Sequence, residues 1–289
     1  MTTDSRTPDT IVFIHGLYLT ARSWELWEKR YTDRGYKVIN ESWPGLEVEV
    51  EALRKDSKPI AKLTVQKILE HYERIIEGLE RPPIIIGHSF GGAFTQVLVS
   101  RGLGATAVGV AAAPVRGVLD VPLITLRSNW KALRNPLFRH SAVMPSAKDF
   151  QFAFTNTFTD EDAAKAYERY AIPASRNVLF TGVNANLNPF TPLKADFKKS
   201  DRAPLLFIAG GKDHVVPASA NLHNAAKYRK SQAITDIIEF PERAHFTAVQ
   251  AGWEEVADYA LQWALNPVTE LSSASATPLQ RVSPAPSSA

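Results

Sequence analysis

Two kinds of hydrophobic pattern alternate along the chain. Short, continuous apolar runs rich in valine and isoleucine are typical of strands buried on both faces. Longer segments in which apolar residues recur every three or four positions are typical of amphipathic helices. The predicted strands are Thr10–Gly16, Tyr36–Ser42, Ile84–Ile86, Thr106–Ala113, Pro204–Gly211 and Ile234–Phe240. The predicted helices between them are Ser23–Arg34, Lys62–Glu80, Phe90–Arg101, Ala218–Lys230 and Trp253–Leu265. This alternation predicts an α/β fold with a mainly parallel central sheet and helices on both faces.

The alternation stops over Arg116–Asp201, which contains several prolines and no strong strand pattern. Helical patterns recur there at Leu123–Leu133, Lys148–Thr155 and Thr159–Tyr170. A segment this long between two core strands is rarely a bare loop, so we interpret residues 115–201 as an inserted helical lid. The expected core is then residues 10–114 and 202–265. Residues 1–9 form an N-terminal arm, and the Ser-, Ala- and Pro-rich residues 266–289 are expected to be a disordered tail.

Two stripes of side chains mark the lid. The first contains phenylalanines spaced four residues apart: Phe150, Phe154 and Phe158. Such a stripe belongs more often to a core than to a substrate wall, although a lid that packs over a pocket can serve as both. The second stripe contains basic residues at helical spacing: Arg127, Lys131 and Arg134. A solvated helix face is the default interpretation for these cations, and binding of an anionic substrate is the alternative.

The segment Gly87-His88-Ser89-Phe90-Gly91 lies between a predicted strand and a predicted helix. A sharp strand-to-helix turn forces its central residue into a strained conformation, and flanking glycines remove side chains that would clash. The serine hydroxyl is then exposed beside the N-terminus of a helix, where a developing negative charge is favoured. We therefore predict that Ser89 is a nucleophile; the alternative is a structural serine in a turn.

A neutral serine hydroxyl needs a base within hydrogen-bond reach, usually a histidine that a carboxylate orients. His245 follows the last predicted strand, on a loop that returns the chain to the edge of the sheet expected to carry Ser89. It is therefore the best candidate among the seven histidines; the alternative is a loop-capping histidine. The others are adjacent to Ser89, within a helix or the lid, next to the candidate acid, or beside the first strand: His88, His71, His223, His140, His214 and His15.

The orienting carboxylate is expected at the end of an earlier strand. Asp213 follows an apolar run and a glycine turn, so it is placed to reach His245 from behind. The corresponding position after Pro114 has no acid before Asp120, which favours Asp213. The alternative role of Asp213 is to cap the next helix or close a turn.

Acyl transfer also needs two N–H groups for the oxyanion. We expect one from Phe90, directly after the nucleophile, and one from Leu17, where Gly16 lets the backbone approach closely; Gly16 can also be a simple turn glycine. Side chains near this edge and in the lid are candidate substrate contacts. They are His15, Gly16, Tyr18, Trp24, His88, Phe154 and Phe158.

Four motifs in this order resemble those of the α/β-hydrolase family, and of its lidded small-molecule carboxylesterases in particular. They are His15-Gly16, Gly87-His88-Ser89-Phe90-Gly91-Gly92, Gly211-Lys212-Asp213-His214-Val215-Val216-Pro217 and Ala244-His245-Phe246. The resemblance covers Thr10–Leu265. It implies a triad of Ser89, Asp213 and His245, oxyanion donors at Leu17 and Phe90, and a lid after the sixth family strand. There is no room for the first two family strands, and without the glycine triplet of one branch, esters of bulky tertiary alcohols are not implied.

Composition narrows the possible partners. The chain has 289 residues, 33 basic and 30 acidic, and no run of basic residues interleaved with aromatics, so nucleic-acid binding is not expected. The absence of cysteine excludes disulfides, thiolate metal sites and a cysteine nucleophile. No apolar segment is long enough to span a membrane and the N-terminus is polar, so we expect a cytoplasmic protein without a membrane partner. Nothing in the sequence indicates the oligomeric state.

Three functions are compatible with these residues. The first is hydrolysis of a small-molecule carboxylic ester through an acyl-enzyme, for which neither a metal nor an organic cofactor is expected. The second keeps the triad but changes the reaction, as in cofactor-free perhydrolases, haloperoxidase-like relatives or carbon–carbon bond hydrolases. The third is a receptor that retains a hydrolase pocket without turnover. The intact triad pattern favours the first.

Overall fold

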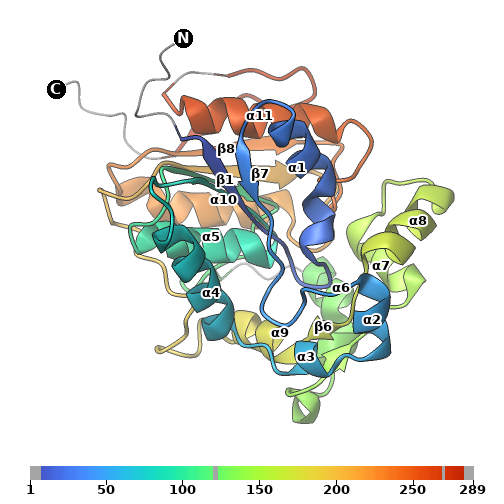
Figure 1. The fold of residues 1–289 in the computed structure, drawn as a ribbon. Helices are drawn as coiled ribbons and strands as arrows, with labels where there is room; N and C mark the ends of the chain where they lie inside the picture. Colours follow the sequence, from blue (N-terminus) through green and yellow to red (C-terminus); the bar gives the residue numbers. More distant parts are fainter. Residues whose placement is uncertain (1–7, 120–122, 269–270, 283–289) are drawn as a thin grey trace.

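A single large sheet runs through the protein, whose computed structural model describes residues 8–119, 123–268 and 271–282 (Figure 1). Within these residues the strand order is β2-β1-β3-β4-β7-β8-β9, and each pairing except β8 with β9 is parallel. The strands are β1 (Thr10–Ile14), β2 (Lys37–Ile39), β3 (Ile84–His88), β4 (Thr106–Val110), β7 (Leu205–Gly210), β8 (Thr235–Phe240) and β9 (Gln280–Arg281). The mainly parallel sheet predicted from the apolar runs is confirmed.

Helices cover both faces of this sheet (Figure 1). On one side α1 packs against α11, where Arg30 forms an ion pair with Asp258. On the other side lie α4, α5 and α10. The helices outside the long insertion are α1 (Glu25–Thr32), α2 (Val50–Lys55), α3 (Lys58–Ala61), α4 (Val65–Glu77), α5 (Phe90–Ser100), α10 (Ala218–Ala226) and α11 (Trp253–Leu265), with short 3-10 turns η1 (Ala21–Trp24) and η3 (Lys227–Lys230). Every residue of β1 and β3 is buried between the two layers, which explains their uninterrupted apolar character.

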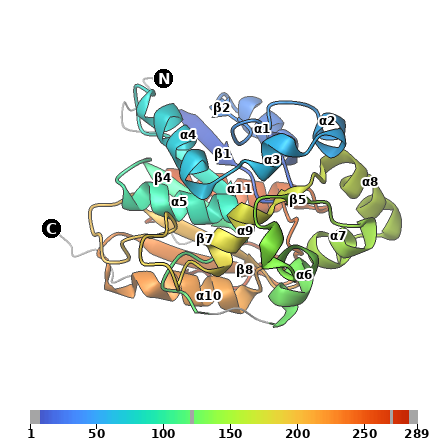
Figure 2. The same cartoon turned by 90° about the horizontal axis from the view of Figure 1, so that it is seen from below.

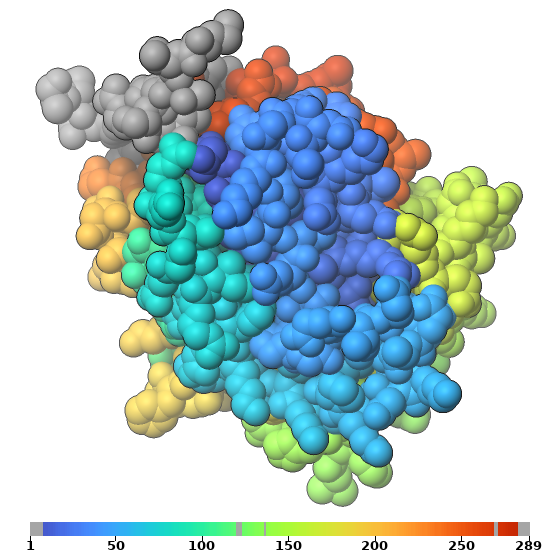
Figure 3. Space-filling view, in the orientation of Figure 1, coloured from blue at the N-terminus to red at the C-terminus, as the bar shows by residue number. Residues whose placement is uncertain are grey.

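The segment between β4 and β7 forms helices and one short two-stranded sheet. Its elements are α6 (Leu123–Leu133), η2 (Pro136–Phe138), β5 (Ala142–Val143), α7 (Ala147–Phe154), α8 (Asp160–Tyr170), β6 (Ala174–Ser175) and α9 (Arg176–Val183). We call these elements the lid. Figure 3 shows that the chain between β2 and α4 lies against it. There the guanidinium of Arg54 on α2 donates hydrogen bonds to the carbonyls of Tyr167 and Ala171.

Part of the C-terminal segment expected to be disordered, residues 271–282, has a defined structure, while residues 283–289 lie outside the described residues. Residues 271–282 cross the edge of the sheet, where β9 pairs with β8. Arg281 donates two hydrogen bonds of 2.9 Å to Asp236, whose side chain is completely buried in β8. A buried carboxylate is costly without a partner, and this segment supplies one. The Ser/Ala/Pro-rich composition did not indicate this order because the partner lies 45 residues away.

Within the described residues, no helix combines the length and apolar character needed to cross a bilayer.

Candidate active site

Ser89 occupies a strained turn between β3 and α5. Its φ is 55° and its ψ is −118°, values that an ordinary side-chain-bearing residue rarely adopts. The flanking glycines are sterically required, since a Cβ on Gly87 would lie 2.2 Å from the carbonyl oxygen of Gly91. A Cβ on Gly91 would lie 2.0 Å from the carbonyl oxygen of Ile14. The sequence therefore presents Ser89 at the N-terminus of α5 as predicted.

Asp213 and His245 form a hydrogen-bonded pair. Nδ1 of His245 donates to Oδ2 of Asp213 at 2.7 Å, and both side chains are fully buried. The second carboxylate oxygen, Oδ1, accepts the backbone N–H groups of Val215 at 2.7 Å and Val216 at 2.8 Å. Because both oxygens have donors, the carboxylate is fixed in orientation. It therefore holds His245 in the tautomer that leaves Nε2 unprotonated.

Nε2 of His245 is buried and has no hydrogen-bond partner in the part of the chain that the structure describes. The Ser89 hydroxyl therefore does not form a hydrogen bond with Nε2 of His245 in this structure. The two residues are nevertheless neighbours, because the His245 ring lies 4.7 Å from the ring of His88, which adjoins Ser89. The His245 ring also lies 4.9 Å from Phe154, which lines the same cavity as Ser89. In unliganded sites such catalytic contacts are often long and tighten when substrate binds.

Two backbone N–H groups near Ser89 have no hydrogen-bond partner among the residues that the structure describes. Among the described residues, neither Leu17 nor Phe90 donates a backbone hydrogen bond. Both residues line the cavity that contains Ser89. Gly16 brings the first loop against the turn, because a Cβ at that position would lie 3.0 Å from Cβ of Ser89. Leu17 and Phe90, the two residues predicted to supply N–H donors, therefore lie in the wall of the cavity that contains Ser89.

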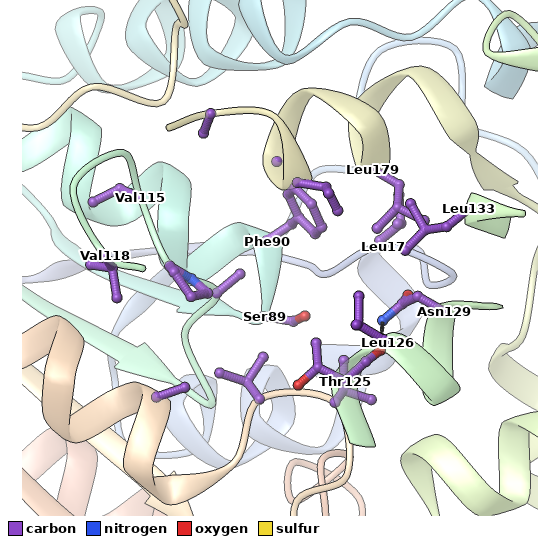
Figure 4. A pocket seen from close by; sticks show the side chains of 18 of the residues that line it. Leu17, Ser89, Phe90, Val115, Val118, Thr125, Leu126, Asn129, Leu133 and Leu179 are labelled. Carbon is purple, nitrogen blue, oxygen red and sulfur yellow. Dashed lines mark hydrogen bonds between the residues drawn. The ribbon is translucent and has the colours of Figure 1, made fainter. Parts of the chain in front are cut away.

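Ser89 opens into an apolar cavity of about 110 Å³ (Figure 4). Figure 4 shows Phe90 and Leu179 on one side of the serine, and Thr125 and Leu126 of α6 on another. Tyr18 and Phe154 also line the cavity. The lid therefore contributes much of the wall, and the side chains available for substrate contact are mostly hydrocarbon.

A family model described as alpha/beta hydrolase family matches residues 11–259, most of the chain. The chain belongs to the alpha/beta hydrolase family. A search of curated proteins found no matching sequence. The assignment agrees with the strained turn at Ser89, the strand order of the sheet and the family resemblance of the motifs.

Solved structures with the same fold include several hydrolases, at low sequence identity. A methylesterase from Arabidopsis is 14% identical, with a TM-score of 0.61 over 88% of this chain and 97% of that chain. A pyrethroid hydrolase from Sphingobium faniae is 16% identical, with a TM-score of 0.61 over 90% and 99%. An extracellular alpha/beta-hydrolase from a Paenibacillus species is 19% identical, with a TM-score of 0.63 over 90% and 100%. At such identities the comparison establishes the fold shared with this alpha/beta hydrolase.

Several residues predicted to contact the substrate of this alpha/beta hydrolase do not line the cavity that contains Ser89. The His15 ring is held by Trp43, whose backbone N–H donates to Nε2 of His15 at 3.0 Å and whose ring stacks on it at 4.6 Å. Burial lowers the pKa of His15 to about 3. His88 donates from Nε2 to the backbone carbonyl of His245 at 2.8 Å, and burial holds its pKa well below the usual range. Neither side chain lines the cavity, because each is held by backbone groups.

Of the other residues predicted to contact the substrate, some line this cavity and some do not. Tyr18 and Phe154 line the cavity, whereas Gly16, Trp24 and Phe158 do not. Trp24 is buried in an aromatic cluster, where it stacks on Phe13 at 4.7 Å. Asp120, the acid at the rival position, lies outside the described residues.

The sequence analysis did not predict the hydrogen bonds that join the lid to the loops carrying Asp213 and His245. Ser128 on α6 donates to the carbonyl of His214 at 2.8 Å, and His214 donates to the carbonyl of Phe152 on α7 at 2.8 Å. The backbone N–H of Phe246 donates to the carbonyl of Phe154 at 3.0 Å. The one signal in the sequence for these lid contacts is that His214 directly follows Asp213 and Phe246 directly follows His245. Residues of α9 also line the cavity, although their pattern did not predict a helix.

Proposed function

We propose that this alpha/beta hydrolase cleaves small-molecule carboxylic esters through an acyl-enzyme on Ser89, with His245 as the base and Asp213 as the group that orients it. The observation that carries the proposal is the buried 2.7 Å hydrogen bond between His245 and Asp213 behind a strained serine turn. A buried carboxylate fixed on both oxygens and an unpartnered Nε2 are what proton transfer from a serine requires.

The first half of the reaction forms the acyl-enzyme. Oγ of Ser89 attacks the ester carbonyl carbon while its proton passes to Nε2 of His245. The carbonyl oxygen becomes an oxyanion between the N–H groups of Leu17 and Phe90. The carbon–oxygen bond to the alcohol then breaks, and the alcohol departs with the proton from Nε2.

The second half releases the acid. Water attacks the acyl carbonyl while Nε2 of His245 takes its proton, and the oxyanion forms again between the same two donors. When the tetrahedral intermediate collapses, Ser89 recovers its proton and the carboxylic acid leaves. The mostly hydrocarbon wall supports an ester whose acyl or alcohol part is apolar. The esterase and hydrolase names of the structural neighbours agree with this choice.

The test is steady-state hydrolysis of a series of p-nitrophenyl esters by the full chain and by three variants. We expect turnover by the natural chain and loss of at least about 10³-fold with Ser89→Ala and with His245→Gln. His71→Gln is the matched control, because His71 lies on the outer helix α4. Equal turnover by Ser89→Ala, or peracid formation from acetate and peroxide in preference to ester cleavage, would overturn the proposal.

A further inference from the structure

The outward face of α6 is unusual for a helix in contact with water. Its exposed positions recur at helical spacing: Leu123, Leu126, Arg127, Trp130 and Lys131, followed by Arg134. Leu123 is 84% exposed and Trp130 is 62% exposed. An outward helix face normally carries polar and mixed-charge residues. Here three large apolar side chains share the face with three cations, and this face contains no acid.

Exposed apolar side chains gather around this helix. Of the twelve large ones exposed in the described residues, nine lie between Leu119 and Phe190. Helices α6 and α9 are in contact, and Figure 2 shows them side by side on the face seen from below. Leu126 on α6 and Val183 on α9 are each exposed and also line the cavity of Ser89. Two residues of the apolar surface therefore also belong to the wall of the cavity.

Positive charge surrounds the same surface. From residue 123 to residue 148 the chain contains five lysines and arginines and no aspartate or glutamate. Lys131 forms an ion pair with Asp149 on α7, and the other basic residues on the outward face of α6 are Arg127 and Arg134. A hollow that Leu119 also lines is lined by three basic residues of η3 and by no acid. These are Lys227, Arg229 and Lys230.

We infer that this surface docks the protein onto an anionic lipid bilayer. We call it the lid face and define it by the exposed apolar residues Leu119, Leu123, Leu126, Trp130, Val183 and Leu187 with the cations that flank them. Apolar side chains, and tryptophan in particular, enter the boundary between head groups and acyl chains, while cations remain near the phosphates. Such peripheral contact needs no membrane-spanning helix.

The lid face also suggests the source of the substrate. Because Leu126 and Val183 belong both to the lid face and to the wall of the cavity, an ester dissolved in the bilayer can enter the cavity beside them without crossing water. This second part rests on the proposed function, whereas the docking itself does not. The two are therefore measured separately.

Docking is tested by co-sedimentation of the full-length Ser89→Ala chain with phosphatidylcholine vesicles and with vesicles that contain one third phosphatidylglycerol. We expect partition onto the anionic vesicles that falls as salt rises. Trp130→Ser and Leu123→Ser should each lower the partition coefficient about tenfold, because each removes a large apolar side chain from the contact. Arg134→Gln should lower it about fivefold on the anionic vesicles alone.

Matched controls come from other surfaces. Val48→Ser removes an apolar side chain that is 55% exposed outside the lid, and Lys165→Gln removes a cation on α8; neither should change partition. Thermal unfolding confirms that each variant is folded. Docking is refuted if the chain stays in the supernatant with both lipids, or if the control variants weaken partition equally. It is also refuted if sedimentation velocity shows a dimer that Trp130→Ser dissociates, since a second copy then covers the lid face.

The substrate part is tested with active chain. A long-chain fluorogenic ester dissolved in anionic vesicles should be hydrolysed faster by the natural chain than by Trp130→Ser, while a short water-soluble ester should be hydrolysed equally by both. Partition without hydrolysis of either ester would refute the proposed function and leave docking in place. Equal loss on both esters would refute delivery from the bilayer.

Discussion

The hydrogen bonds around Asp213 predict how Asp213→Asn changes the tautomer of His245. The native Oδ1 accepts two backbone N–H groups, from Val215 and Val216. An asparagine must place its carbonyl oxygen there, because its NH₂ group cannot accept these bonds. The NH₂ group then faces Nδ1 of His245 and turns it into an acceptor. The proton moves to Nε2, so that His245 can no longer take the proton of Ser89.

The size of the effect follows from the role of the tautomer. In Ser-His-Asp triads this exchange lowers turnover by about 10⁴-fold, or roughly 5 kcal/mol of transition-state stabilisation. We expect a loss of this order in kcat/KM for an aryl ester with Asp213→Asn, measured at neutral pH. Because the amide nearly matches the carboxylate in shape and keeps the two backbone bonds, the thermal unfolding midpoint should change little.

Asp236→Asn is the matched control for burial. Asp236 is also a completely buried carboxylate, but its partners are Trp263 and Arg281. This variant should be less stable and should keep kcat/KM. A loss below about tenfold in Asp213→Asn, or equal losses in the two variants, would refute the assignment of Asp213 as the orienting group.

Three further predictions concern stability and the serine turn. Burial lowers the pKa of His15 to about 3, so the unfolded chain binds a proton that the folded chain does not, and stability falls as pH decreases from about 6.5 towards 3. His15→Gln should reduce the slope of unfolding free energy against pH by about 1.4 kcal/mol per unit, measured by urea unfolding over this range. Arg281→Ala removes a partner of the buried Asp236 and should cost about 1–3 kcal/mol in urea unfolding. Gly16→Ala places a Cβ 3.0 Å from Cβ of Ser89 and should lower kcat for an aryl ester about 10²-fold while the chain stays folded.

Each of these three predictions has a contradicting result. An unchanged pH slope in His15→Gln would mean that this histidine is protonated in the folded state. An unchanged free energy of unfolding in Arg281→Ala would mean that β9 does not stabilise the sheet. An unchanged kcat in Gly16→Ala would mean that the loop after β1 does not position Ser89.

The strands and the long helices were predictable because their patterns are local. The apolar run of β1 needs burial on both faces, and α11 begins and ends where its periodicity does. The serine turn was predictable for the same reason, since its glycines are required by contacts between neighbouring segments. These features depend little on the rest of the chain.

Other features depend on distant partners and were not predictable. His15 follows a strand at the correct edge of the sheet, but the direction of its ring is decided by the backbone of Trp43. The C-terminal residues looked disordered by composition, yet a buried carboxylate on β8 binds Arg281. Helix α9 was not predicted from its pattern, and its side chains Leu179 and Val183 contribute to a cavity wall that other segments complete. In each case the missing information was tertiary.

The most direct test of the proposed chemistry is the intact mass of the full chain after exposure to a small fluorophosphonate, beside Ser89→Ala treated in the same way. Such a probe phosphonylates a serine only when nucleophile, base and oxyanion donors act together. The proposal predicts one adduct on the natural chain and none on the variant. Adduct formation on neither chain, or equally on both, would contradict the assignment of Ser89 as the nucleophile of an assembled site.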